Sequence, residues 1–222
     1  MLFEIEHKKL AQIKQVATEN NTTVFTLLLA VFKICLHKIS NENDICVGIV
    51  LNGRSNAVVE PEVGMFVKTL PVRTIIDPAR SFTDYLLSVE TNIGNVEKHQ
   101  DLPQQFDVAK IVDVLFVFQN PEFSIYDNIN FEEFSLQYMQ QTRIIPRNPL
   151  TFNFSQRVNK MIFEADFDAG VYTEETIVFV SSMFLDLIGL VILHHALPVE
   201  AYKMNANENK TGGEYITVDF EF

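Results

Sequence analysis

The chain has 222 residues, of which 47% are hydrophobic and 21% charged, a composition typical of a globular protein with a substantial core. Its formal net charge of −12 would repel phosphate backbones and anionic lipid, so we expect neither nucleic acid nor a membrane as a partner. The longest apolar runs, VFTLLLAVFKICL and FLDLIGLVIL, are too short or too interrupted by charge to span a membrane and favour core helices. The N-terminal residues lack the apolar stretch of a signal peptide. We therefore expect a cytoplasmic protein in which Cys35 and Cys46 are buried, reduced thiols.

The N-terminal part predicts two helices. Residues 7–19 repeat apolar side chains at helical spacing. In the NNTT sequence that follows, Thr22 or Thr23 is the expected N-cap of a longer helix that ends near Ile39. The apolar positions of this second helix surround it, so it should be buried on most sides.

Strands and a third helix are predicted next. The apolar runs 45–51 and 114–119 are typical of strands that are buried on both faces. A strand near residues 69–76 contains Pro71, which cannot donate to a β-ladder and so indicates a sheet edge or a strand start. Ser81 is the expected N-cap of a helix that lies between these strands.

The C-terminal part reads as strands followed by a closing helix. Segments 129–138, 149–156 and 159–168 alternate apolar and polar residues, which predicts strands with one buried face. Thr173 is the expected cap of the closing helix, and residues 203–213 are polar and expected to be mobile. The whole order predicts an α/β or α+β fold, with helices packed on a mixed sheet.

The residue pattern offers no complete catalytic or metal site. A zinc site needs about four nitrogen or sulfur ligands at short spacing, and the five histidines and two cysteines form no such cluster. His194 and His195 are adjacent and point about a third of a turn apart on a helix, which suits a helix end better than a shared ligand set. Asp166 and Asp168 lie on one side of a strand, where a solvated face is favoured over an acid pair.

Three stretches carry further information. VGMFVKTLPVR (63–73) resembles the motif I-G-M-F-V-N-T-L-P-L-R, HQDLP (99–103) matches H-Q-D-x-P, and VLFVFQNP (114–121) is similar to F-x-V-x-F-x-x-Q-N. These are motifs of nonribosomal peptide synthetase condensation domains. The flanking helix, strand and Gly-Arg stretch and the closing helix resemble the family in the same order, so the resemblance covers residues 2 to 195.

The resemblance implies a chloramphenicol-acetyltransferase-like half-domain. In this family two similar subdomains enclose a tunnel, and an amide forms between thioesters carried on the phosphopantetheine arms of carrier proteins. No bound cofactor is implied. The catalytic motif His-His-x-x-x-Asp-Gly belongs to the N-terminal subdomain and is absent from these 222 residues. We therefore expect residues 1–198 to form the C-terminal subdomain, and residues 199–222 to be a polar tail or linker.

The implied partners are the N-terminal subdomain, in the same or another chain, and peptidyl or aminoacyl carrier proteins. An orphaned half should also expose an apolar face and self-associate. Such a half would be catalytically incomplete alone. The alternative is a non-catalytic remnant or a scaffold that binds carrier proteins with the same fold.

The resemblance assigns tunnel or subdomain-junction residues, but no catalytic residue and no metal ligand. Arg54 is the candidate partner of the absent motif's aspartate, and a solvated turn arginine is the alternative. Gly64 implies a close backbone approach. Met65 and Phe66 are either junction or core residues. Lys68 stands where the family usually has Asn, which places a cation near the expected tunnel.

The remaining motif residues are more ambiguous. Gln119 and Asn120 match the family's Gln-Asn pair and either reach the tunnel or simply end a strand. His99 and Asp101 are expected to be structural. Only ten residues, 104–113, separate the second and third motifs, fewer than is usual in the family. This short connection indicates a diverged, truncated or split protein.

Overall fold

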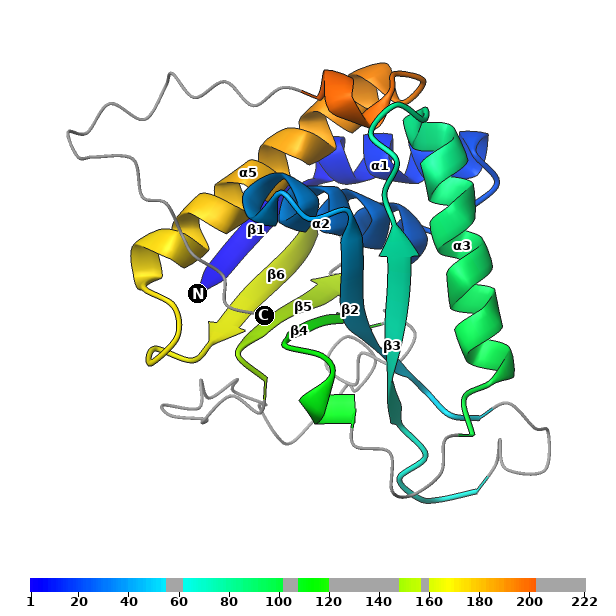
Figure 1. Cartoon of the computed structure of the whole chain (residues 1–222), viewed down its shortest axis with the longest axis vertical. Helices are drawn as coiled ribbons and strands as arrows, with labels where there is room; N and C mark the ends of the chain where they lie inside the picture. Colours follow the sequence, from blue (N-terminus) through cyan, green and yellow to red (C-terminus); the bar gives the residue numbers. More distant parts are fainter. Residues whose placement is uncertain (55–61, 102–107, 120–147, 157–159, 203–222) are drawn as a thin grey trace, which may run out of the picture.

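The computed structural model describes residues 1–54, 62–101, 108–119, 148–156 and 160–202. Its strands form one six-stranded sheet in the order β1-β6-β5-β4-β2-β3 (Figure 1). The strands are β1 (Leu2–Glu6), β2 (Asp44–Leu51), β3 (Lys68–Ile75), β4 (Val114–Gln119), β5 (Leu150–Gln156) and β6 (Lys160–Phe167). The helices are α1 (His7–Glu19), α2 (Val24–Ser40), α3 (Phe82–Lys98) and α5 (Glu174–His194), with 3₁₀ turns η1 (Val108–Lys110) and η3 (Val199–Ala201).

The sheet is mixed, as predicted. Strands β2, β4 and β5 run parallel to one another, whereas β1, β3 and β6 are antiparallel to their neighbours. Strand β3 is an edge strand of the described sheet, so the expectation for Pro71 is confirmed. Pro71 lies opposite Gly48 of β2, and no described strand pairs with the other side of β3. Strand β1 was not predicted. Its LFEIE sequence alternates weakly, and only its antiparallel pairing with β6, more than 150 residues later, defines it.

The core lies between one face of the sheet and the helices. Helices α1, α2, α3 and α5 lie on this face, and α2 crosses its middle between α5 and α3 (Figure 1). The ring centroids of Phe32 in α2 and Phe152 in β5 lie 4.6 Å apart. The ring of Phe184 in α5 packs edge-on against the Phe32 ring, with centroids 5.7 Å apart. Such aromatic pairs add about 1 kcal/mol each beyond their buried area. Six fully buried phenylalanines make up this cluster: Phe32, Phe116, Phe152, Phe154, Phe163 and Phe184.

Three predicted N-caps are confirmed. The hydroxyl oxygens of Thr23, Ser81 and Thr173 each accept a hydrogen bond from the backbone N–H three residues later. Each cap stabilises its helix by about 1 kcal/mol. The choice between Thr22 and Thr23 is settled in favour of Thr23.

The opposite face of the sheet is less covered than the sequence predicted. The apolar runs of β2 and β4 predicted burial on both faces, but Cys46, Val50, Leu115 and Val117 are only half-buried there. Among the residues that the structure describes, no helix covers this second face, although such apolar runs usually indicate one. The prediction of two buried thiols therefore holds for Cys35, whose pKa is raised by burial, and not fully for Cys46.

The closing helix α5 is a core helix. Its 21 residues are apolar enough to cross a membrane by length and composition, but half of that window is buried against the rest of the fold. After α5, Val199 and Tyr202 are buried, and the Tyr202 hydroxyl donates to the His194 carbonyl at 2.8 Å. The strand expected at 129–138 and the mobile segment expected at 203–213 lie outside the described residues.

Among the described residues, the side chain of Lys33 is an ionisable group inside the core. Lys33 of α2 is fully buried, and its Nζ donates to the Val72 carbonyl at 2.6 Å and to the Thr74 hydroxyl at 2.8 Å. A longer contact of 3.4 Å joins Nζ to the Ile45 carbonyl. Removal from water lowers the pKa of Lys33 to about 7, because burial penalises the charged ammonium.

Candidate functional site

The three motif stretches meet at one edge of the sheet. Strands β2 and β4 are parallel, so both end at this edge, and β3 begins there because Lys68 lies opposite Leu51. Helix α3 packs on β3 and ends at the same side, where Asp101 reaches Lys68. We call this place the motif edge; it comprises residues 52–54, 62–68, 99–101 and 119. In open α/β sheets the carboxyl ends of parallel strands are the usual place for a ligand site.

The turn after β2 depends on a glycine. Gly53 has a φ of +67°, a left-handed conformation that residues with a side chain rarely adopt. A Cβ at this position would lie 1.8 Å from the Phe66 carbonyl oxygen, so two backbone segments touch here. Sequence reasoning assigned this close approach to Gly64, which instead has an ordinary φ and a Cβ position 3.0 Å from the Phe66 ring. The Asn-Gly dipeptide at 52–53 was the available signal for Gly53.

The Arg54 side chain contacts residues 62–66, at the start of the first motif of its own chain. Its Nη1 donates to the Glu62 carbonyl at 2.7 Å, and a longer contact of 3.5 Å joins Nη2 to the Gly64 carbonyl. The guanidinium lies 4.5 Å from the centroid of the Phe66 ring, within the range of a cation–π contact. Arg54 is therefore held in place by residues 62–66. A solvated turn arginine, the alternative interpretation, would not make these contacts with residues 62–66.

Phe66 and Met65 differ in burial, although they are adjacent in the chain. Phe66 is half-buried beneath the Arg54 guanidinium, whereas the Met65 side chain is 92% exposed. The alternative that Met65 is a core residue is therefore wrong. Phe66 therefore makes the inner contact of this segment, while its neighbour Met65 lies in solvent.

An ion pair joins the first and second motifs. The Lys68 ammonium donates to an Asp101 carboxylate oxygen. Lys68, which stands where the family usually has Asn, is thus neutralised by Asp101 of the second motif. Its charge is not left unpaired beside the expected tunnel. His99 ends α3, and its Nδ1 contacts the Asn95 carbonyl at 2.8 Å.

Gln119 completes the described part of the motif edge. It is the exposed last residue of β4, and its side-chain amide donates to the Asn153 side chain on β5 at 3.3 Å. The neighbouring candidate, Asn120, lies outside the described residues. Gln119 therefore both ends its strand and presents a polar group at this edge.

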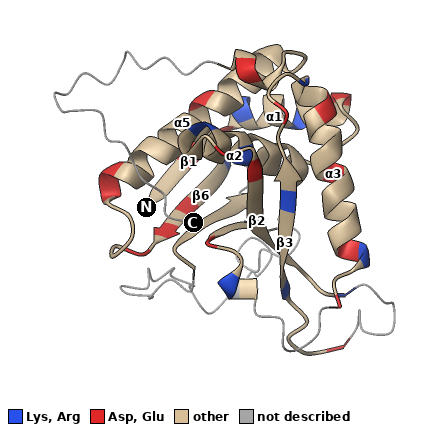
Figure 2. Ribbon diagram, viewed as in Figure 1, with Lys and Arg blue, Asp and Glu red and all other residues tan. Residues whose placement is uncertain are grey.

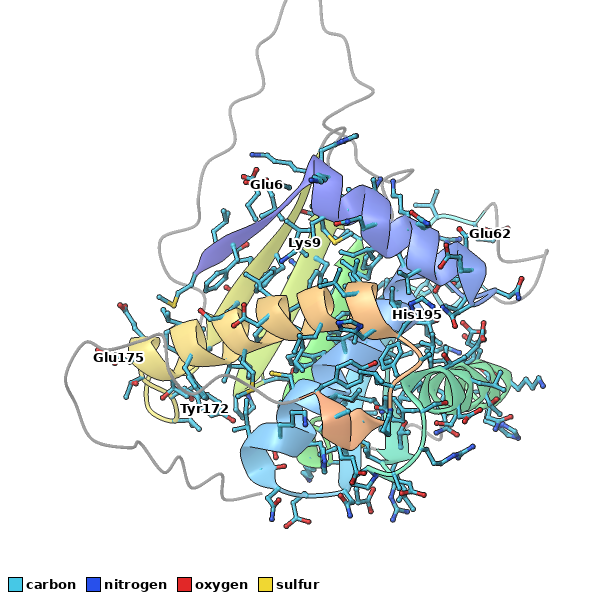
Figure 3. All side chains as sticks on the ribbon, turned by 90° about the horizontal axis from the view of Figure 1, so that it is seen from above. Glu6, Lys9, Glu62, Tyr172, Glu175 and His195 are labelled. Carbon is cyan, nitrogen blue, oxygen red and sulfur yellow. The ribbon has the colours of Figure 1, made fainter. Side chains whose placement is uncertain are left out.

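The adjacent histidines lie elsewhere. His194 is the last residue of α5 and His195 is its C-cap, as Figure 3 shows for His195. The helix-end interpretation is confirmed, because the His194 and His195 carbonyls accept hydrogen bonds from Tyr202 and Thr83. Asp166 is exposed on β6 and Asp168 accepts a hydrogen bond from the Gly170 N–H, so they form no described acid pair.

A separate pocket of about 440 Å³ lies at the opposite edge, where β2 and β4 begin. Its lining includes Asp44 and Cys46. Hydrogen bonds from Arg73 lower the pKa of Asp44, and burial raises the pKa of Cys46. A carboxylate already paired and a thiol disfavoured as thiolate make this pocket a weaker candidate than the motif edge.

The side chains described at the motif edge can donate hydrogen bonds to a bound molecule and hold it in position. Within the part of the chain that the structure describes, no group of three or more His, Cys, Asp or Glu side chains is arranged to hold a metal. In Figure 2, charged residues are dispersed over the helices, strands and turns rather than gathered into one basic area. The side chains of Arg54, Lys68 and Gln119 can orient a bound acyl group but supply no base at neutral pH. The His99 imidazole is the group at the motif edge that could act as a base, and its Nδ1 contacts the Asn95 carbonyl.

The chain belongs to the condensation domain family. The family model described as "Condensation domain" matches residues 1–211, and the mixed sheet with its helices is the fold of solved condensation domains. One solved structure with this fold is a holo four-domain nonribosomal peptide synthetase bound to AMP and glycine, which superposes with a TM-score of 0.75 at 14% identity, covering 90% of this chain and 17% of that one.

Particular relatives make the match concrete. The chain is 28% identical over 222 residues to tyrocidine synthase 3 from Brevibacillus parabrevis. The matched region covers 94% of this chain and 3% of that protein. It is 27% identical over 218 residues to gramicidin S synthase 2 from Brevibacillus brevis, covering 91% and 5%.

Solved structures agree in fold. The X-domain from teicoplanin biosynthesis superposes with a TM-score of 0.79 at 14% identity, covering 92% of this chain and 49% of that one. The condensation domain of the polyketide synthase MokA gives 0.73 at 15%, covering 90% and 48%. The chain thus spans about half the length of these solved domains.

Proposed function

We propose that this chain is the C-terminal half of a peptide-bond-forming condensation domain, and that it is active only with an N-terminal half. The observation that supports this most is the meeting of three family motifs at one sheet edge, in a chain half as long as solved condensation domains. The 222 residues contain no His-His-x-x-x-Asp-Gly sequence, so the catalytic histidine would come from the other half.

The proposed reaction joins two carrier-bound thioesters. The acceptor amine attacks the donor thioester carbonyl, a C–N bond forms and the C–S bond breaks. The amine loses one proton and the released phosphopantetheine thiolate gains one. A histidine of the other half would act on the amine as a base or as a positioning group. The phosphopantetheine arms arrive as substrate carriers, and no resident cofactor is required.

The motif edge would form one wall of the tunnel. Arg54 is proposed to meet the aspartate of the absent motif, joining or replacing its present contacts with Glu62 and Gly64. Gln119 would direct its amide toward the bound acyl group. Lys68 would stay paired with Asp101 and so keep its charge from the acceptor amine. Asn120 is proposed to continue the wall beyond Gln119.

The boundary expected at residue 198 is proposed with one change: Val199 and Tyr202 pack into the core of the half-domain, so a tail or linker would begin after Tyr202. The proposed setting is the cytoplasm, where carrier proteins deliver both thioesters. An acidic chain with a net charge of −12 gives no long-range attraction to acidic carriers, so docking would depend on local contacts.

A reconstitution experiment tests this function. The purified chain is mixed with donor and acceptor aminoacyl thioesters on carrier proteins, with and without an N-terminal condensation half. Mass spectrometry of the acceptor carrier should show a peptide only when both halves are present. Product formed by this chain alone would overturn the claim that it is catalytically incomplete, and no product from the pair would count against the function itself.

A scaffold role is the second candidate, and one observation favours it. The X-domain from teicoplanin biosynthesis, which shares this fold, has been solved in a complex with OxyB, so a domain of this fold can bind another protein. On this alternative the chain binds carrier or tailoring proteins without catalysis. Retained carrier binding by a reconstituted pair that forms no product would support it.

A further inference from the structure

A cavity of about 440 Å³ lies where β2 and β4 begin, and we call it the β2–β4 cavity. Its walls come from the end of α2, the start of β2, the η1 turn and the start of β4. Its volume falls in the range of small-molecule sites. Asp44 at this cavity and Leu51 at the motif edge are the two ends of β2, about 23 Å apart at about 3.3 Å per residue. The cavity is therefore separate from the proposed tunnel wall.

The cavity exists because β2 and β4 part at their beginnings. Their described pairing covers two positions, Gly48 with Leu115 and Ile49 with Phe116. Residues 44–47 of β2 therefore have no described strand partner on the β4 side.

This parting leaves backbone groups of β2 open toward the cavity. The Ile76 N–H donates to the Asn43 carbonyl across the β2–β3 pair. In an antiparallel pair, the backbone groups of alternate residues face the partner strand, and those between them face away. The N–H and C=O of Cys46 therefore face the side where β4 has diverged.

Both rims of the cavity are held by hydrogen bonds to backbone groups. The Glu42 N–H donates to the Ser40 hydroxyl at 3.2 Å, and the Glu42 carbonyl contacts His37 Nδ1 at 2.7 Å. On the other rim, the Asn148 side-chain amide donates to the Val112 carbonyl at 2.9 Å. A cavity with fixed walls loses less conformational entropy when it binds a ligand.

The charges of the lining favour a cation. Among the described residues that line the cavity, three carry carboxylates, Glu42, Asp44 and Asp113, and one, Lys110, carries an ammonium. The Arg73 guanidinium balances Asp44 through contacts of 2.6 to 2.9 Å. Glu42 and Asp113 then outnumber Lys110, and the net charge of −12 also favours cations over anions.

The remaining lining favours an apolar body on that cation. Leu36, Ile45 and Val114 are buried, and Ile111 is 50% exposed. No aromatic ring is among the described lining, whereas sites for quaternary ammonium ions use aromatic rings. A primary ammonium instead donates three hydrogen bonds, which suits carboxylate and carbonyl oxygens.

We propose that the β2–β4 cavity binds a primary ammonium group carried on a short alkyl chain. Glu42 and Asp113 would hold the ammonium, and Leu36 and Ile111 would contact the chain. Free alkylamines and the lysine side chains of peptides both carry this group, and the open backbone of Cys46 could pair with an extended peptide. The inference goes beyond the proposed function and does not depend on it.

An NMR titration of the full chain tests the site. The probe is n-hexylamine, which is protonated at neutral pH; n-hexanol lacks its charge and hexanoate reverses it. Backbone amide shifts should change at residues 44–46 and 110–114, and n-hexanol and hexanoate should bind at least about tenfold more weakly than n-hexylamine. Binding of n-butylamine should be about tenfold weaker, because two fewer methylene groups leave water.

A double substitution removes the two carboxylates and keeps their shape. Glu42→Gln with Asp113→Asn should weaken binding of n-hexylamine at least about fivefold. It should leave the unfolding midpoint unchanged, because both side chains are exposed. The matched control, Glu97→Gln with Glu200→Gln, removes two exposed carboxylates elsewhere and should bind n-hexylamine like the unsubstituted chain.

A blocked pentapeptide with one central lysine distinguishes the two sources of the ammonium. Tighter binding than n-hexylamine, with slower hydrogen exchange at Cys46, identifies a lysine side chain; weaker binding identifies a free amine. Equal binding of n-hexanol and n-hexylamine, unchanged binding by the double variant, shift changes outside both ranges, or no saturable shift would each overturn the proposal. Peptide formation by the reconstituted halves is a separate readout, so the two proposals can fail independently.

Discussion

Lys33 gives the sharpest test of the folded core, because it is a buried ammonium whose pKa differs between the folded and unfolded chain. Burial lowers that pKa from 10.5 to about 7. The unfolded chain therefore holds this proton more tightly, and between these two pH values it binds more protons than the folded chain. Stability should then rise as pH rises through the folded pKa, and the full penalty should apply below it.

The size of the effect follows from linkage. A group with these two pKa values adds about 1.4 kcal/mol to the free energy of unfolding between about pH 6 and pH 8. The window ends below the range in which the raised pKa values of Cys35 and Cys46 would act in the opposite direction. Lys33→Met removes the titrating group and keeps the length of the side chain.

Urea unfolding at several pH values measures the effect. The difference in unfolding free energy between the unsubstituted chain and Lys33→Met should change by about 1.4 kcal/mol across the window, in favour of the unsubstituted chain at higher pH. Lys14→Met, which removes an exposed lysine from α1, should show no such change. A flat difference for Lys33→Met would refute the reasoning, because it would mean that hydrogen bonds from Nζ keep the ammonium charged throughout.

Three further experiments test separate features. Gly53→Ala should lower the free energy of unfolding by at least about 2 kcal/mol, because of its positive φ and the backbone contact, whereas Gly94→Ala in an open position of α3 should raise it by about 0.5 kcal/mol in the same thermal melts. Thr173→Ala should cost about 1 kcal/mol in urea unfolding through loss of the α5 cap, and an unchanged midpoint would contradict the cap. His194→Ala with His195→Ala should leave peptide formation by the reconstituted halves unchanged, and a loss of more than about tenfold would show that the pair is catalytic after all.

Local signals were enough for most elements of the fold. The caps at Thr23, Ser81 and Thr173 were predictable because a hydroxyl satisfies a nearby N–H without help from the rest of the chain. Pro71 indicated an edge for the same local reason, since it lacks the donor that an inner strand would need. The family motifs were also visible in the sequence, in their correct order.

What the sequence by itself determined is therefore the family, the order of most elements and the residues that would gather at a site. Only the tertiary structure decided that β1 joins the sheet, that Lys68 is neutralised by Asp101, and that Arg54 holds the first motif of its own chain. The physical reason is distance along the chain. Periodicity and capping act within a few residues, whereas pairs such as Lys68 with Asp101 form only when the sheet and α3 bring remote segments together.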